Sequence, residues 1–173
     1  MPDDSTVVTS GRWLEFRRTA AGWEFVRRRK ATGIVAVAAV TADDRMVLVE
    51  QFRPPMACRA IEIPAGLAGD EEAGESLEAA ARRELLEETG FSGGAWRRLF
   101  TGPPSAGLSD EMVTFFLARS VVRTAAGGGV AGEDVAVHVV PRQGIATWLA
   151  ERERAGLAID PRVFVALHFA AGG

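Results

Sequence analysis

The sequence has little of what stabilises secreted proteins or anchors membrane proteins. It contains a single cysteine, Cys58, so no intrachain disulfide can form, which fits a reducing compartment. No apolar run approaches the ~20 residues of a membrane-spanning helix. The polar, acidic segment over residues 1–10 lacks the apolar core of a signal peptide. These absences predict a cytoplasmic protein without a membrane partner.

The sequence also lacks an excess of positive charge. The 173 residues carry a net charge of −3, and the one basic block that stands out is residues 27–30, so a nucleic-acid partner is not expected. The hydrophobic content of 47% and the charged content of 25% are ordinary for a globular protein. We find no internal repeat and no domain-sized linker. The sequence therefore predicts one domain over residues 11–173, preceded by a flexible tail over residues 1–10.

Apolar patterns predict a strand-rich chain. Residues 12–18 and 23–29 alternate as the two strands of a hairpin, and residues 34–41 form a continuous apolar run typical of a strand buried on both faces. Further strands are expected at residues 45–52, 59–63, 96–100, 112–118 and 135–140.

Two helices are predicted near the C-terminal end, at residues 141–154, opening on a proline, and at residues 160–170. In the second, Asp160 is the expected N-cap and Pro161 the first helical residue. Together with a helix inside residues 69–91, these elements indicate an α+β fold with helices packed on a mixed sheet.

The segment over residues 69–91 is the most informative. From about Ser76 it is rich in Ala, Leu, Glu and Arg, so it predicts a helix with Ser76 as N-cap and Gly90 as the closing left-handed residue. At about 100° per residue, three carboxylates share one helix face. They are Glu84, Glu87 and Glu88.

Clustered carboxylates repel one another unless a cation joins them, and an all-oxygen set suits a hard ion such as Mg²⁺ or Mn²⁺. The alternative is a solvated helix face with Arg–Glu pairs four residues apart, as Arg83 and Glu87 are.

The spacing of the whole segment favours the metal site. It reads Gly69, five residues, Glu75, seven residues, Arg-Glu-Leu at 83–85, one residue, Glu-Glu at 87–88, one residue, Gly90 and an apolar residue. This resembles the box of the Nudix hydrolases at every fixed position. At average residue frequencies a chance match has a probability below about 10⁻⁸ per starting position. The resemblance implies an α/β/α sandwich and an enzyme that cleaves a nucleoside diphosphate linked to another moiety.

Motifs outside the box resemble the ADP-ribose pyrophosphatase branch. They are Gln-Phe-Arg-Pro-Pro-Met at 51–56, Glu-Ile-Pro-Ala-Gly-Leu at 62–67 and Ser-Ala-Gly-Leu-Ser-Asp-Glu at 105–111. The resemblance implies Mg²⁺-dependent hydrolysis of ADP-ribose to AMP and ribose 5-phosphate. One position departs, because this branch typically has Ser-Pro-Gly where the chain has Ala106. Another nucleoside diphosphate sugar (ADP-glucose or GDP-mannose), another Nudix substrate, and a sensor that binds ADP-ribose without cleaving it are therefore alternatives.

The resemblance also implies metal-binding and catalytic roles. The metal ligands would be the backbone carbonyl of Ala65 and the carboxylates of Glu84, Glu87 and Glu88, with Glu75 and Arg83 forming a supporting salt bridge. Glu87 is also a catalytic candidate. The general base would be Glu133, in a loop before a late strand, with Glu111 as the rival.

Substrate contacts are implied as well. Trp13 and Trp23 would sandwich the adenine ring, one from each subunit of a homodimer, with the hairpin over residues 11–31 in the dimer contact. Arg28 and Arg53 would bind the phosphates and the ribose. The remaining expected substrate contacts are Glu24, Leu67 and Ser105.

Ordinary structural roles are the alternative for several of these residues. The two tryptophans could fill a hairpin core, the two arginines could form surface salt bridges, and Glu133 could be an exposed loop carboxylate. His138 and His168 lie among apolar residues and are expected to be packed rather than catalytic. Cys58 has no histidine near it in the sequence, which argues against a nucleophile.

Overall fold

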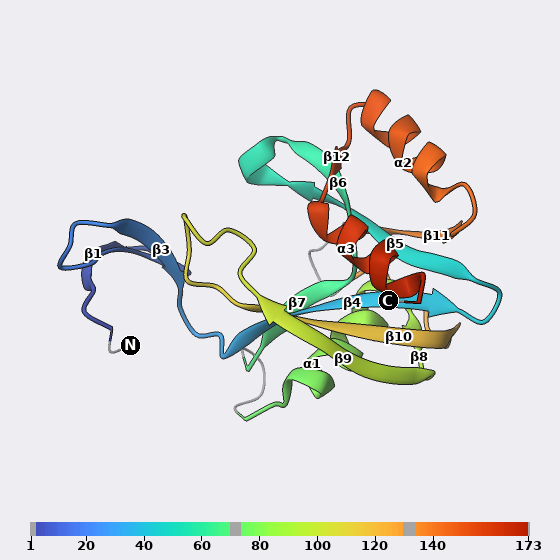
Figure 1. The fold of residues 1–173 in the computed structure, drawn as a ribbon, viewed down its shortest axis with the longest axis horizontal. Helices are drawn as coiled ribbons and strands as arrows, with labels where there is room; N and C mark the ends of the chain where they lie inside the picture. Colours follow the sequence, from blue (N-terminus) through green and yellow to red (C-terminus); the bar gives the residue numbers. More distant parts are fainter. Residues whose placement is uncertain (1–2, 70–73, 130–133, 173) are drawn as a thin grey trace.

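The computed structural model describes residues 3–69, 74–129 and 134–172 of the chain. These residues form two sheets, a small three-stranded one near the N-terminus and a nine-stranded mixed one. Figure 1 shows the small sheet standing away from the main body. It contacts the body where the backbone N–H of Val26 donates to the carbonyl of Leu108 at 2.9 Å.

The small sheet is antiparallel, with strands β1 (Thr6–Ser10), β2 (Leu14–Arg18) and β3 (Glu24–Arg28) in that order. The expected hairpin is confirmed as β2 and β3. The expectation of a loose tail over residues 1–10 is wrong for β1, which pairs with β2. Its Thr-Val-Val-Thr sequence explains this, because β-branched residues favour a strand.

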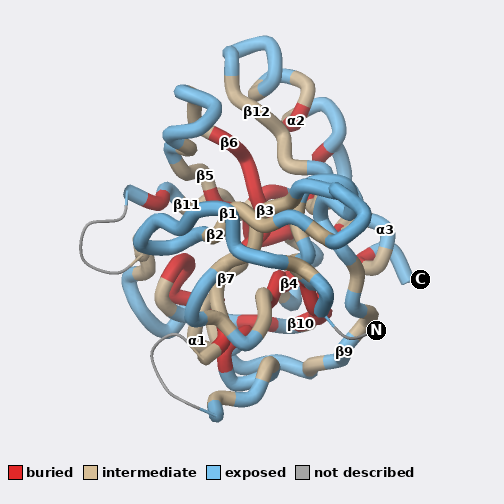
Figure 2. The backbone as a smooth tube through the Cα atoms, turned by 90° about the vertical axis from the view of Figure 1, so that its left-hand side faces the viewer, coloured by how far each residue is buried: buried red, intermediate tan, exposed pale blue. Residues whose placement is uncertain are grey.

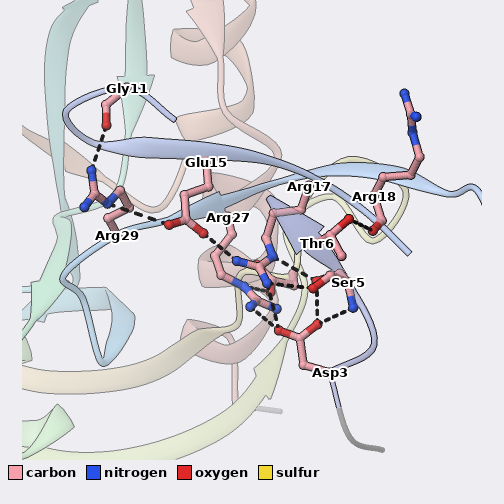
Figure 3. A network of polar contacts seen from close by, with 10 residues as sticks. Asp3, Ser5, Thr6, Gly11, Glu15, Arg17, Arg18, Arg27 and Arg29 are labelled. Carbon is pink, nitrogen blue, oxygen red and sulfur yellow. Dashed lines mark hydrogen bonds and ion pairs between the residues drawn. The ribbon is translucent and has the colours of Figure 1, made fainter. Parts of the chain in front are cut away.

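A polar network holds the chain start against this sheet (Figure 3). The carboxylate of Asp3 accepts a hydrogen bond from Nη1 of Arg27 at 2.5 Å. Nη2 of Arg17 donates to the backbone carbonyl of Ser5 at 3.0 Å. Hydrogen bonds from Ser5 and Arg27 hold the pKa of Asp3 well below its usual range. The residues before β1 are therefore tied to β2 and β3.

The large sheet is centred on β4 (Gly33–Thr41), which pairs in parallel with β10 (Val113–Arg123) and antiparallel with its other neighbours. The strand order is β12-β6-β5-β4-β10-β8, with β11 on β5, β7 on β4 and β9 on β10. The remaining bounds are β5 (Arg45–Arg53), β6 (Cys58–Glu62), β7 (Ala65–Ala68), β8 (Phe91–Ser92), β9 (Ala95–Gly102), β11 (Val135–Pro141) and β12 (Ala158–Ile159), with a 3₁₀ turn, η1 (Pro54–Met56). Every expected strand is present; β7, β8 and β12, of two to four residues, carry no sequence pattern to find them by.

Among the described residues there are three α-helices. The helix α1 (Leu77–Thr89) has the expected caps, since Oγ of Ser76 accepts from the backbone N–H of Ala79 at 3.2 Å and Gly90 has φ 75°. α3 (Pro161–Ala170) begins as expected after Asp160. None of these helices is long and apolar enough to cross a membrane.

The remaining helix, α2 (Ile145–Arg154), begins later than the expected residue 141. Pro141 instead ends β11, opposite Arg45, and Gly144, with φ 86°, precedes the helix. Proline was therefore misread as the first helical residue, because the same residue type is tolerated at the end of an edge strand.

Two cores lie on opposite faces of the large sheet. Along β4, Val35, Val37 and Ala39 face α1, while Ala36, Ala38 and Val40 face α2 and α3. All six are essentially inaccessible to solvent, which confirms a strand buried on both faces. Figure 2 shows the buried backbone running along β4, β6 and β10. The fold is thus an α+β, α/β/α sandwich on a mixed sheet, as expected.

Candidate metal and substrate site

Two carboxylates of α1 approach the start of β7. Glu88 is 8% exposed, and its Oε2 accepts a hydrogen bond from the backbone N–H of Ala65 at 3.1 Å. The Glu84 carboxylate lies against Gly66, where a Cβ atom would be 2.0 Å from Cδ of Glu84. Glycine at position 66 therefore lets the helix carboxylate reach the backbone of β7.

Arg83 links the box to β7. Its guanidinium donates to Glu75 at 3.0 Å and to the carbonyl of Leu67 at 2.9 Å, which confirms the expected Glu75–Arg83 salt bridge. It also donates to Glu84 at 2.9 Å and to Glu87 at 3.1 Å. These contacts raise the pKa of Arg83, with the hydrogen bond to Glu75 as the main cause, and lower the pKa of Glu75.

The donors around β7 fit a hard divalent ion through oxygen atoms alone. Glu84 and Glu88 approach Gly66 and Ala65 there, and Arg83 donates to both Glu84 and Glu87. In the part of the chain that is described, no cluster of three or more His, Cys, Asp or Glu side chains is arranged to hold a metal ion. Two carboxylates and one carbonyl are compatible with Mg²⁺, because this ion retains several waters and completes its shell on substrate phosphates.

A pocket of about 490 Å³ opens beside these groups; we call it the Ala65 pocket. It brings together four further residues expected from the sequence, namely Arg28, Arg53, Leu67 and Glu111. Nε of Arg28 donates to Oε1 of Glu111 at 2.8 Å. Glu111, a candidate general base, is therefore paired with Arg28, a candidate phosphate-binding residue. The other lining residues are Ile34, Gly66, Pro104, Val113, Asp160, Pro161 and Arg162.

A second pocket, of about 510 Å³, shares Arg28, Ile34 and Glu111 with the first; we call it the Arg98 pocket. It adds Arg27, Arg98 and Asp110, which the sequence analysis missed as site residues. Arg27 forms an ion pair with Asp110 at 2.5 Å. The basic block at residues 27–30 was the available signal for Arg27. The other lining residues are Ala31, Thr32, Gly33, Leu77, Thr101, Met112 and Thr114.

Four expected substrate contacts lie outside both pockets. Trp13 and Trp23 are 57% and 61% exposed, so core packing of the two tryptophans is wrong. Glu24 pairs with Arg18 at 2.6 Å on the small sheet. Ser105 is exposed, and its carbonyl closes a turn in the loop before β10. Glu133, the first candidate for the general base, lies outside the described residues.

The two histidines differ. His138 is half-buried, hydrogen-bonded to Glu50 at 2.9 Å, and packs on Trp148 with ring centroids 5.2 Å apart, as expected of a packed histidine. His168 is exposed on α3, so the expectation of packing is wrong there. Its ring stands edge-on to Phe169 at 5.0 Å.

Glu62 and Arg162 were also missed. Glu62 is 3% exposed and lies between Arg53 and Arg162. Its hydrogen bonds raise the pKa of Arg53. Burial alone would lower the pKa of Arg162, but its hydrogen bonds to Asp160 outweigh burial and raise that pKa overall. No sequence signal pairs Glu62 with Arg162, because they lie 100 positions apart in the chain.

The chain is similar to known proteins at the levels of family, sequence and fold. The model of the NUDIX domain matches residues 30–158. The chain is 41% identical over 92 residues to an ADP-ribose pyrophosphatase of Bacillus subtilis, covering 53% of this chain and 48% of that protein. It is 39% identical over 103 residues to an ADP-sugar pyrophosphatase of Mus musculus (50% and 46%), and 38% identical over 104 residues to a GDP-mannose pyrophosphatase of an Enterobacter species (56% and 52%). The chain thus spans about half the length of these curated relatives.

A crystal structure of an ADP compounds hydrolase superposes with a TM-score of 0.64 at 19% identity, covering 83% of this chain and 80% of that one, and so supports the fold. The family model spans most of the chain and includes the box on α1, with its carboxylates turned to β7. The chain belongs to the NUDIX domain family.

Proposed function

We propose that the protein hydrolyses the pyrophosphate bond of ADP-ribose, with a divalent metal ion, to give AMP and ribose 5-phosphate. The observation that carries this proposal is the approach of Glu84 and Glu88 to Ala65 and Gly66 at the wall of a pocket that also contains Arg53. The ADP-ribose and ADP-sugar pyrophosphatases among its relatives support the substrate class.

Glu84, Glu87, Glu88 and the carbonyl of Ala65 would hold the ion, Mg²⁺ or Mn²⁺, and Arg83, which pairs with both Glu84 and Glu87, would orient these carboxylates. When bound, such an ion neutralises charge on phosphate oxygens and acidifies a bound water. The chain supplies the remaining functions. Arg28 and Arg53 line the Ala65 pocket and would bind phosphate oxygens through charge-assisted hydrogen bonds.

A base must take the proton of the attacking water as the P–O bond to the leaving phosphate breaks. Glu133 is the first candidate by its place in the sequence. Glu111 is the candidate inside the pocket, and its pairing with Arg28 at 2.8 Å gives it a second possible role. In that role Glu111 orients Arg28 until a substrate phosphate replaces the carboxylate.

The adenine ring would stack on Trp13 and Trp23. Both indoles are exposed on the small sheet, which stands away from the body in Figure 1. A sheet in that position could reach the pocket of a second subunit, so the proposal includes a homodimer. Exposed indole faces suit base stacking, since every base offers a flat π-surface.

Hydrolysis of another nucleoside diphosphate sugar is the second candidate. Ala106 replaces the proline typical of ADP-ribose hydrolases, and GDP-mannose pyrophosphatases are among the relatives at 38% identity. Both substrates would use the same metal ligands and phosphate contacts, so they differ in the part of the site that receives the base and the sugar.

The purified full chain, with Mg²⁺, should be assayed by chromatography against ADP-ribose, ADP-glucose, GDP-mannose, NADH, diadenosine polyphosphates and nucleoside triphosphates. The proposal predicts the highest kcat/KM for ADP-ribose, with AMP as product. A higher value for GDP-mannose would select the second candidate. Tight ADP-ribose binding without turnover of any compound would contradict both and indicate a sensor.

A further inference from the structure

A buried carboxylate joins two arginines in the wall of the Ala65 pocket. Oε1 of Glu62 accepts from Nε of Arg53 at 2.5 Å, and Oε2 accepts from Nη2 of the same arginine at 2.6 Å. The same Oε2 accepts from Nη2 of Arg162 at 3.1 Å. Both arginines line the pocket, whereas Glu62 is 3% exposed and lies behind them. One carboxylate therefore fixes two guanidinium groups side by side.

Backbone pairing brings Glu62 and Arg162 together, although they lie 100 positions apart in the sequence. β12 pairs in parallel with β6, and the ladder continues where the N–H of Asp160 donates to the carbonyl of Ile61 at 3.0 Å. The start of α3 is thereby held over the end of β6, which is Glu62. The Asp160 carboxylate then accepts from Nε of Arg162 at 3.0 Å and from its Nη2 at 2.6 Å, so the side chain is held at two points.

Both arginines keep donors for a ligand. A guanidinium has five N–H donors, and these contacts use Nε and Nη2. Among the described residues, Nη1 of Arg53 and Nη1 of Arg162 make no hydrogen bond to the protein, and neither is a buried atom left without a partner. Each arginine that lines the pocket therefore keeps an Nη1 group whose donors the described residues do not use.

The local charge also favours a ligand role. Arg53 and Arg162 are close enough that the charge of Arg53 lowers the pKa of Arg162, yet Glu62 and Asp160 offset both charges. Buried ion pairs contribute little to stability when compared with apolar packing, so stability alone is a weak reason for four ionised groups here. Two fixed guanidiniums that line one pocket suit the neighbouring oxygens of a diphosphate.

We infer that Arg162 is a phosphate-binding residue of the Ala65 pocket, and that Glu62 is a positioning residue that sets Arg162 and Arg53 for one diphosphate. The inference rests on the proposed pyrophosphatase function and adds a ligand from α3, outside the box and the motifs around it. Arg162 would contribute to the binding of the diphosphate rather than to the chemical step. Its hydrogen bonds go to Glu62 and Asp160 and not to the carboxylates of α1.

The test combines kinetics with a measurement that needs no turnover. Arg162→Gln and Arg162→Lys are compared with the wild-type chain by titration calorimetry, with inorganic pyrophosphate as the probe, and by KM and kcat on the substrate chosen by the panel. We expect Arg162→Gln to weaken pyrophosphate binding and to raise KM by about tenfold each, with a smaller change in kcat. The lysine variant should recover part of the loss, because it keeps the charge but not the fork geometry.

Glu62→Gln tests the positioning role. It leaves both arginines in place but removes the charge that holds them, so KM should rise while a melting curve still shows a folded protein. Arg142→Gln is the matched control, because Arg142 forms a similar pair with Asp44 at 2.7 Å and lines neither pocket.

The inference is overturned if folded Arg162→Gln binds pyrophosphate as the wild type does, even if its melting temperature falls, because Arg162 is then structural. It is also overturned if the wild-type chain does not bind pyrophosphate. If the wild type turns over no substrate, the proposed function fails. The binding comparison still decides the role of Arg162 in that case.

Discussion

The carboxylate of Glu84 occupies the space that a side chain at Gly66 would need. A Cβ at position 66 would lie 2.0 Å from Cδ and 2.1 Å from Oε1 of Glu84. Position 66 has no left-handed backbone that would itself demand glycine. The close approach of the two groups is therefore the reason for glycine, and it connects the residue before the box to a carboxylate inside it.

Gly66→Ala should remove most activity while the protein still folds. The added methyl displaces the Glu84 carboxylate from β7, so we expect a loss of about 10²-fold or more in kcat, as for a misplaced catalytic group. Steady-state kinetics with Mg²⁺ measure this. Gly102→Ala is the control, because a Cβ there meets only the ring of Phe100 at 3.4 Å, an ordinary contact. Near wild-type turnover of Gly66→Ala would show that the position of Glu84 is unimportant.

Glu84→Gln and Glu88→Gln should each abolish metal-dependent hydrolysis. Each keeps the shape of the side chain but removes a charged oxygen ligand for the divalent ion. Chelation of the metal by EDTA should abolish the activity of the wild type, and added Mg²⁺ should restore it. Glu78→Gln on the same helix is the control, because Glu78 is exposed and pairs with Arg82 at 2.7 Å. Full turnover by Glu84→Gln and Glu88→Gln would refute the metal site.

The two candidate bases should respond differently. Glu133→Gln should lower kcat by about 10²–10⁴-fold, the usual contribution of a general base. Glu111→Gln should mainly raise KM, because Glu111 holds Arg28 at 2.8 Å in the pocket wall. Separate kcat and KM values across a pH series distinguish the two effects. If Glu111→Gln loses kcat and Glu133→Gln does not, the roles are reversed.

Trp13→Ala and Trp23→Ala should each raise KM for ADP-ribose by about tenfold, since stacking on a base contributes about 1–3 kcal/mol. Titration of tryptophan fluorescence with AMP reports the same contact. Trp148→Phe is a suitable control, because Trp148 lies on α2 beside His138. Analytical ultracentrifugation tests the homodimer that this role requires. A monomer in which neither substitution changes KM would exclude the shared adenine site.

The Glu75–Arg83 pair should make stability depend on pH. The hydrogen bond from Arg83 lowers the pKa of Glu75 in the folded state. The pair therefore stabilises the fold fully when the pH is above the pKa of Glu75 in the unfolded chain. This stabilisation is lost as the pH falls through the lower pKa of Glu75 in the folded protein. Glu75→Gln should lower the free energy of unfolding by about 1 kcal/mol at neutral pH. Its difference from the wild type should shrink below about pH 4.5. Urea titrations at several pH values, with exposed Glu153→Gln as control, measure this. A difference that does not change with pH would contradict the assignment.

The local sequence was sufficient to predict α1 and β4. Ser76 and Gly90 cap α1 through contacts within the same turn, and the apolar run of β4 needs only burial on two faces. The start of α2 was misplaced because Pro141 suits both a helix start and an edge strand. The β-branched residues of β1 favour a strand, but its pairing with β2 and the contacts of Asp3 that hold it depend on the folded sheet.

The candidate site likewise has residues that the sequence predicts and residues that it does not. The box carboxylates and Arg53 follow from spacing and resemblance. In the structure Arg53 and Ala65 line one pocket, and Glu84 and Glu88 approach its wall at Gly66 and Ala65. Glu62 and Arg162 could not be paired from the sequence, because their contact depends on the parallel register of β12 on β6. The exposed positions of Trp13 and Trp23 were not predictable either, because each residue directly precedes a strand, β2 or β3, where strand alternation does not set the side-chain direction.

The pairing of β12 with β6 has a consequence for how the protein is made. The helix that carries the box carboxylates lies near the middle of the chain, but Arg162 reaches Glu62 only after α3 has docked. A nascent chain would therefore present the box carboxylates before Arg162 joins Arg53 at the Ala65 pocket. Under the proposed role of Arg162, the strength of pyrophosphate binding would report whether β12 and α3 have docked on β6, which secondary structure alone does not reveal.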